Sequence, residues 1–292
     1  MNRCLKALFV AAAMAGIIYP AAAHRQWLLP STTVLSGEDP WVSFDAASSN
    51  DIFYADHRPM NLSTIKVWAP DGSEGQIQNG ATGQYRSVFD VKLDKPGTWK
   101  IGSQMSILTG TFKVNGEERR VGRPGGGGPP PGASAAGGIG AGAPGPAPVA
   151  ASDIPANATD VKLTEMSSRN EVFVTSGEPS TTVFTSTGKG LEMVPVTHPN
   201  ELVSNEPASF RFLVDGKPAP DLKVTIIPGG KRYRDGEDGI EVTTGADGVV
   251  KINWPTAGMY WLNATLTDNK VSDPRATSRR LSYATTLEVL AP

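Results

Sequence analysis

The sequence predicts an all-β protein with two antiparallel β-sandwich domains joined by a disordered linker. Three observations support this prediction. Short apolar or alternating runs recur along most of the chain, turn sequences rich in Gly, Pro, Asp and Asn separate them, and no window of a dozen residues carries the apolar stripe of a helix. With 39% hydrophobic and 19% charged residues, the composition excludes a coiled coil, a collagen repeat and a wholly disordered chain.

Residues 1–23 have the three-part pattern of a secretory signal peptide. Arg3 and Lys6 give a basic start, an apolar run follows, and small alanines end the segment at Ala23. The run is too short to span a membrane as a permanent helix, and no other stretch reaches the ~20 apolar residues required. We therefore expect a chain that is exported to the periplasm and cleaved near Ala23, with no integral membrane segment after cleavage.

The cysteine content and the charge balance narrow the possible partners. The single Cys, Cys4, belongs to the expected signal peptide, so the exported chain can form neither a disulfide framework nor a thiolate metal site. The chain has 27 Lys and Arg residues against 29 Asp and Glu residues. It has no basic patch of the kind that binds nucleic acid, so we expect no nucleic-acid partner.

Residues 24–121 form the predicted N-terminal β-sandwich domain. Sequences such as Asn79-Gly80 and Lys95-Pro96-Gly97 are typical of turns, and they separate the apolar or alternating runs. These runs lie at residues 41–44, 65–68, 85–91 and 107–114.

Aromatic residues are concentrated in this first domain. We expect Trp41, Phe44 and Phe89 to face the core, because small sandwiches use large aromatic residues at inward-facing positions. Trp27 and Tyr54 are open to two interpretations. They are either core residues or part of a face that stacks a carbohydrate or a siderophore.

Residues 122–151 form the predicted flexible linker. In residues 121–150, 25 of 30 positions are Gly, Pro or Ala, which leaves few side chains to bury and many residues that interrupt strands. We expect this stretch to connect two lobes without fixing their relative position.

Residues 152–292 form the predicted C-terminal domain. Its apolar runs lie at residues 208–214, 222–227, 240–243, 249–254, 259–266 and 281–290. Asp215-Gly216, Gly229-Gly230 and Asp247-Gly248 supply the turns between them. The order of turns and strands resembles the immunoglobulin-like or transthyretin-like modules of exported bacterial proteins, which indicates architecture rather than function.

The three histidines, His24, His57 and His198, are candidate metal ligands. Cleavage after Ala23 would make His24 the first residue, so that its amine and its imidazole could chelate one ion as in a histidine brace. His57 or His198 could supply a second imidazole. Each of them also has a simpler interpretation, because both precede or adjoin a Pro and are compatible with hydrogen-bonded turns.

Carboxylates near these histidines could complete a metal site. The candidates are Asp45, Asp51 and Asp56. A set of nitrogen and oxygen ligands favours nickel, cobalt, copper, iron or zinc, and it leaves the identity of the metal open. No spacing in the chain is as specific as His-Glu-x-x-His or paired Cys-x-x-Cys.

Three segments resemble the bacterial periplasmic family called domain of unknown function 4198. They are Ala23-His24-Arg25-Gln26-Trp27-Leu28-Leu29-Pro30, residues 41–59 and residues 190–200. The similarity covers both domains, with the linker as a variable insertion. The resemblance implies metal handling, because members are commonly grouped with periplasmic components of nickel and cobalt uptake and some sit near iron-uptake receptors. It implies no catalytic residues.

We therefore expect a non-enzymatic periplasmic protein that binds a transition metal, or a metal chelate, for uptake or delivery. The chain contains no Gly-x-Ser-x-Gly elbow, no catalytic Cys and no P-loop. One alternative is a structural or interaction module of the envelope that docks to a membrane transport or receptor component. A further alternative is a copper-dependent redox enzyme that uses the brace.

Overall fold

The computed structural model describes residues 24–122 and 146–292. The expected signal peptide and residues 123–145 of the expected linker lie outside this range. The described residues form 20 β-strands and four short 3₁₀ helices, with no α-helix among them. The prediction of an all-β fold is confirmed. Across the same residues, no helix has the length and the apolar character needed to cross a membrane.

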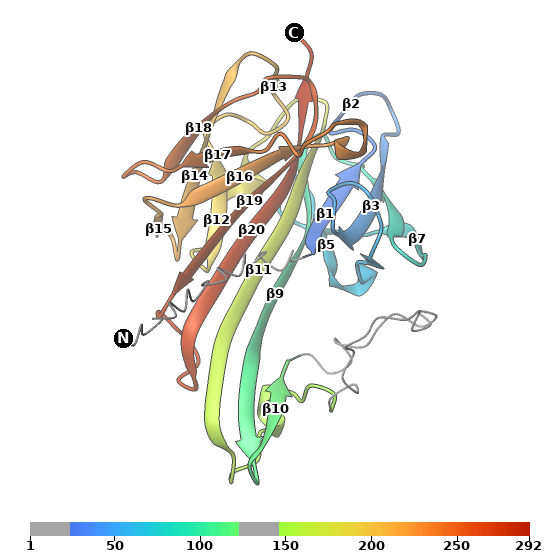
Figure 1. The fold of residues 1–292 in the computed structure, drawn as a ribbon. Helices are drawn as coiled ribbons and strands as arrows, with labels where there is room; N and C mark the ends of the chain where they lie inside the picture. Colours follow the sequence, from blue (N-terminus) through green and yellow to red (C-terminus); the bar gives the residue numbers. More distant parts are fainter. Residues whose placement is uncertain (1–23, 123–145) are drawn as a thin grey trace, which may run out of the picture.

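An eleven-stranded central sheet runs through the molecule (Figure 1). Its strand order is β17-β16-β19-β20-β11-β9-β5-β6, and the short strands β10, β13 and β2 pair with β9, β20 and β11 respectively. The strands are β2 (Val34–Leu35), β5 (Ile65–Trp68), β6 (Glu74–Gly75), β9 (Gly97–Val114), β10 (Glu117–Val121), β11 (Thr159–Ser176), β13 (Leu202–Val203), β16 (Lys223–Pro228), β17 (Ile240–Thr243), β19 (Gly258–Asp268) and β20 (Ala276–Leu290).

Two smaller sheets complete the architecture. The N-terminal sheet has the order β1-β3-β8-β7, with β4 on β3, and the C-terminal sheet has the order β12-β14-β15, with β18 on β14. Their strands are β1 (Arg25–Pro30), β3 (Trp41–Ser49), β4 (Arg58–Pro59), β7 (Gln78–Thr82), β8 (Ser87–Lys92), β12 (Leu191–Pro195), β14 (Pro207–Val214), β15 (Lys217–Pro218) and β18 (Val249–Asn253). The 3₁₀ helices are η1 (Leu62–Thr64), η2 (Ala151–Asp153), η3 (Thr182–Phe184) and η4 (Lys231–Tyr233).

The two smaller sheets pack on opposite faces of the central sheet. Successive side chains of a strand point to opposite faces, and β11 shows the consequence. Val172 and Val174 belong to the core under the N-terminal sheet, whereas Phe173 belongs to the core under the C-terminal sheet. The molecule is therefore a three-layer β structure in which two sandwiches share their middle layer.

The first core confirms two of the three aromatic predictions. Phe44 and Phe89 are each 1% exposed, and their rings stack with centroids 4.9 Å apart. The prediction for Trp41 is wrong, because its side chain is 39% exposed. Val42 and Phe44 take the inward positions of β3, so the alternation of the strand turns Trp41 outward, where the ammonium group of Lys92 lies over its ring.

Strands from both predicted domains pair directly. Along most of their length, β9 and β11 form one antiparallel ladder, and β11 pairs with β20 in parallel. This differs from the expectation that a linker leaves the two lobes free to move, because the ladder connects them without help from the linker. The domain boundaries at residues 121 and 152 stay a prediction.

The chain segments that precede residue 123 and follow residue 145 meet beside β10. The amide of Gly122 donates to the carbonyl of Val149 over 3.0 Å, and the amide of Val149 donates to the carbonyl of Arg120 over 3.0 Å. Val149 and Ala151 pack against a small apolar cluster that contains Phe112. Residues 146–151, which the sequence analysis assigned to the linker, therefore belong to the folded part of the chain.

Candidate functional site

A cavity of about 500 Å³ opens between the N-terminal sheet and the central sheet. Residues of β1, β3 and the segment 57–64 form one side of it, and residues of β9 and β11 form the other. Its wall combines the two histidines His24 and His57 and the two methionines Met60 and Met105 with Arg58. Neutral amide and hydroxyl side chains form most of the remaining wall.

The imidazoles of His24 and His57 stack on each other. Their ring centroids are 3.5 Å apart, and the ring planes differ by 8°. Strand pairing brings them together, since Arg25 of β1 pairs with Ser49 of β3 and Arg58 of β4 pairs with Ser48. Each histidine directly precedes one of these strands, so both lie at the same end of β3.

This stacked arrangement prevents the two imidazoles from coordinating the same metal ion in their present orientations. The lone pair of an imidazole nitrogen lies in the plane of the ring, so two nearly parallel rings cannot both direct a lone pair at one ion. One ring has to turn about its side-chain bonds before both can bind the same metal. Partial burial lowers the pKa of His57, the neighbouring His24 and Arg58 lower it further, and Asp56 opposes them. A lowered pKa favours neutral imidazole, which is the form that binds metals.

A loop from the C-terminal half of the chain holds both histidine-bearing segments. Lys231 forms an ion pair with Asp51 over 2.6 Å, and the guanidinium of Arg232 lies 4.8 Å from the ring centroid of Tyr54. On the other side, Arg25 forms an ion pair with Glu237. The loop between β16 and β17 therefore fixes the start of β1 and the turn that carries His57.

The three carboxylates predicted as ligands make other contacts. Asp45 pairs with Arg86 over 3.3 Å, and Asp51 pairs with Lys231. The carboxylate of Asp56 accepts hydrogen bonds from the backbone amide and the side-chain amide of Asn50. In the part of the chain that the structure describes, no group of three or more His, Cys, Asp or Glu residues could hold a metal ion.

His198 lies away from the other two histidines and has local partners. Its Nδ1 accepts from the backbone amide of Asn200 over 3.2 Å, so Nε2 carries the proton and can donate to Oγ1 of Thr98, 3.0 Å away. Burial lowers the pKa of His198, and a hydrogen bond with the Ser180 carbonyl opposes that effect. Thr98 precedes Gln104, a cavity residue, by six residues of β9, or roughly 20 Å along an extended strand.

Sequence reasoning missed several residues of the cavity. Met60 follows the segment that carries His57, and Met105 lies within the long strand β9, but neither stands in a motif that marks a site. Asn170 of β11 lies behind Met60, with its Nδ2 3.9 Å from the methionine sulfur. It is 4% exposed, and its Oδ1 has no hydrogen-bond partner in the structure. No spacing in the sequence indicates that these residues meet.

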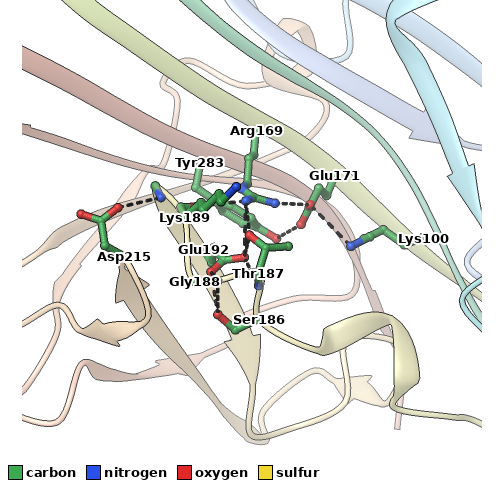
Figure 2. Close-up of polar contacts among 11 residues, drawn as sticks. Lys100, Arg169, Glu171, Ser186, Thr187, Gly188, Lys189, Glu192, Asp215 and Tyr283 are labelled. Carbon is green, nitrogen blue, oxygen red and sulfur yellow. Dashed lines mark hydrogen bonds and ion pairs between the residues drawn. The ribbon is translucent and has the colours of Figure 1, made fainter. Parts of the chain in front are cut away.

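A second polar cluster is buried between the central and C-terminal sheets (Figure 2). Arg169 lies 3.7 Å from Glu171 and 3.4 Å from Glu192, and the hydroxyl of Tyr283 donates to Glu171 over 3.1 Å. Lys100 lies 4.0 Å from Glu171. The two positive and two negative charges are paired, and the free space beside them is only about 10 Å³. This cluster therefore leaves no room for a ligand.

The fold and the cavity define a β-sandwich protein with an accessible polar cavity between two of its layers. The chain belongs to the family described as domain of unknown function (DUF4198), whose family model matches residues 21–268. This confirms the resemblance noted in the sequence. It does not extend to the implied link with nickel and cobalt uptake, and a search of curated proteins found no match.

Several solved structures show a distant similarity to this chain. The mouse nectin-like molecule 4 ectodomain (Ig1–Ig3) has 10% identity and a TM-score of 0.19, with 93% of this chain and 66% of that chain covered. The D0–D1 domain of intimin has 10% identity and a TM-score of 0.22, with 89% and 97% covered. The tandem V-type regions of VCBP3, a v-region-containing chitin binding protein, have 9% identity and a TM-score of 0.19, with 89% and 98% covered.

The chain thus spans slightly less than two thirds of the nectin-like ectodomain. Similarities at these TM-scores carry no argument about the site.

Proposed function

We propose that this chain is a non-enzymatic periplasmic binding protein that takes up a transition-metal ion or a metal chelate and delivers it to a membrane transport or receptor component. The observation that carries the proposal is the pairing of His24 with His57 at the wall of a cavity. Two imidazoles that precede separate strands and line one cavity are the beginning of a ligand set. The rest of the set has to come from nearby atoms or from the ligand itself.

The donors near the pair suit a late first-row metal. Neutral imidazole binds zinc, copper, iron and nickel, and thioether sulfur favours copper in its reduced state. Two residues with thioether side chains, Met60 and Met105, line the same cavity. Cleavage after Ala23 would add the free amine of His24 as a further nitrogen. Nickel, cobalt, copper, iron and zinc all stay candidates.

The test is metal binding by the exported protein with its native N-terminus. Both His24→Ala and His57→Ala should lower the affinity by about tenfold or more, which is the loss of one metal–ligand bond in a partly assembled site. His198→Gln is the matched control, because His198 lies elsewhere and an amide can keep part of its hydrogen bonding. Isothermal titration with each metal and metal analysis of the purified protein are the measurements.

Two results would contradict the proposal. One is the absence of stoichiometric binding for every metal tested. The other is binding that survives the double change of His24 and His57 to Ala. N-terminal sequencing of the exported protein adds an independent check, because a first residue at Arg25 or later would remove His24 altogether.

A further inference from the structure

The cavity is much larger than a single metal ion needs. A water molecule occupies about 30 Å³ in the liquid, whereas the cavity measures about 500 Å³. This volume falls within the range of roughly 300 to 1,000 Å³ that is typical of sites for small organic molecules. The size of the cavity therefore points to a ligand with several non-hydrogen atoms.

The charge of the wall also disfavours a bare cation. Among the residues that line the cavity, Arg58 carries a permanent charge and none is an Asp or a Glu. Asp56 adjoins His57 in the chain but is held by Asn50. A divalent ion that entered alone would meet a guanidinium with no carboxylate to compensate it, so the wall suits an anionic ligand.

The neutral polar groups of the wall suit the oxygens of such an anion. Gln26, Asn61 and Gln104 offer amide N–H donors, and Ser103 and Ser168 offer hydroxyls. These groups come from β1, β9, β11 and the segment before η1, so they surround the space from both sheets. Hydrogen bonds from such donors, together with Arg58, are the usual means by which proteins hold carboxylates.

We infer that the ligand of this cavity is an anionic metal chelate, in which a small hydroxy- or amino-carboxylate already binds the metal ion. Arg58 and the amides bind the carboxylate oxygens of the chelator. Once one of the stacked rings has turned about its side-chain bonds, His57 and His24 occupy the coordination positions that the chelator leaves open. The inference rests on the proposed function and specifies its cargo. In a chelate the carboxylates come from the ligand, so the cavity wall needs no Asp or Glu of its own.

The experiment compares three probes on the same protein. Isothermal titration with Ni²⁺ alone, with Ni²⁺ and citrate, and with citrate alone separates the contributions of metal and chelator, and histidine as a second chelator repeats the comparison. We expect the chelate to bind about tenfold or more tightly than the metal alone, and Arg58→Gln to abolish this advantage, since it removes one charge-assisted contact. Arg58→Gln should leave the affinity for Ni²⁺ alone unchanged or slightly higher.

Arg86→Gln is the matched control, because Arg86 pairs with Asp45 outside the cavity. Equal affinities for metal and chelate, with no effect of Arg58→Gln, would overturn this inference and leave the proposed function intact. Citrate binding as tightly without metal, and unaffected by His57→Ala, would overturn both. Failure of all probes to bind the folded protein would also overturn both. A chelate preference that Arg58→Gln removes and Arg86→Gln keeps would support the inference.

Discussion

Glu192 is an acid whose surroundings favour its ionised form despite burial. It is 5% exposed. Burial by itself would raise the pKa of this carboxyl, but hydrogen bonds from Ser186 and Thr187 and the charge of Arg169 outweigh burial and hold the pKa below its ordinary value of 4.5. The backbone amide of Gly188 also donates to it over 3.0 Å. Figure 2 shows the carboxylate enclosed by these donors.

The change Glu192→Gln should therefore destabilise the protein in a pH-dependent way. At pH 7 we expect a loss of about 2 kcal/mol in the free energy of unfolding, the range for hydrogen bonds to a charged group. Because the folded-state pKa lies below the unfolded one, the contribution of the carboxylate is present above about pH 4.5 and is lost as the pH falls through the folded value. Urea unfolding at pH 7 and at pH 3.5 measures the difference.

The difference between the wild type and Glu192→Gln should shrink at the lower pH. Glu241→Gln on β17 is the control, because Glu241 is exposed and its replacement should change stability little at either pH. An equal loss for Glu192→Gln at both pH values would show that the charge has no part in the effect.

For individual residues, the sequence predicts which side chains are buried better than it predicts which side chains contact each other. Alternation in residues 85–91 correctly places Phe89 in the core. Trp41 was expected in the core because it is aromatic, whereas alternation with Val42 and Phe44 would have placed it outside. The pairing of His24 with His57 was one of several possibilities, because no fixed spacing links the two. The residues around Asp51 do not indicate that it forms an ion pair with Lys231, which lies in the other half of the chain.

Among the elements, the ladder between β9 and β11 depends on one glycine. Gly110 has φ +152°, and a Cβ there would overlap the carbonyl oxygen of Lys162. The register of the two strands shifts just beyond this point, between Thr159 and Lys162. The irregular pairing thus requires the absence of a side chain at residue 110.

The change Gly110→Ala should destabilise the protein by about 3 kcal/mol, since it adds a backbone collision to an unfavourable conformation. Gly116→Ala is the matched control. Gly116 also has a positive φ, +84°, but a Cβ there would meet nothing within 4 Å, so its cost should stay near the ~1 kcal/mol of the conformation alone. Urea unfolding of both variants gives the comparison. Equal losses would mean that the collision is relieved at no cost.

The same ladder shows where prediction of the elements from sequence fails. No apolar or alternating run predicts a strand over residues 159–176, yet β11 lies in the middle of the central sheet. Polar residues fill its centre, and Arg169 and Glu171 are buried. Their partners, including Glu192 and Tyr283, are distant in sequence, so no local period of apolar residues could reveal the strand.

For the whole molecule, the shared central sheet predicts that both sandwiches unfold together. Phe44 lies in the core under the N-terminal sheet, and Phe210 lies in the core under the C-terminal sheet. Each change to Ala should cost about 3 to 5 kcal/mol. Both variants should lower the temperature of one common transition, because β11 contributes to both cores, with Val172 and Val174 in one and Phe173 in the other.

Differential scanning calorimetry tests this expectation. A single transition, with the calorimetric enthalpy equal to the van't Hoff enthalpy, is the expected result for the wild type and both variants. Two transitions, with Phe44→Ala moving one and Phe210→Ala moving the other, would mean that the halves are independent domains. That outcome would restore the arrangement of free lobes expected from the Gly/Pro/Ala stretch.

The order of the strands within the sheets could not be predicted from the sequence, and the reason is physical. Composition predicts two β-rich regions and a Gly/Pro/Ala-rich stretch between them. However, the contact between Gly122 and Val149 and the pairing of β9 with β11 depend on which strands meet in space. Short-range patterns specify strands and turns, whereas the order of strands within a sheet is set by long-range packing.

The position of β20 has a consequence for how the chain reaches its native state. It is the last strand among the described residues, yet it lies between β19 and β11 inside the central sheet (Figure 1). Until residues 276–290 are in place, β11 presents an open strand edge, which is a site for wrong pairing with other chains. Because β11 and β20 are far apart in sequence, their pairing is also expected to form slowly during folding. A chain interrupted before residue 276 would therefore be prone to aggregate, and completion of the central sheet depends on residues 276–290.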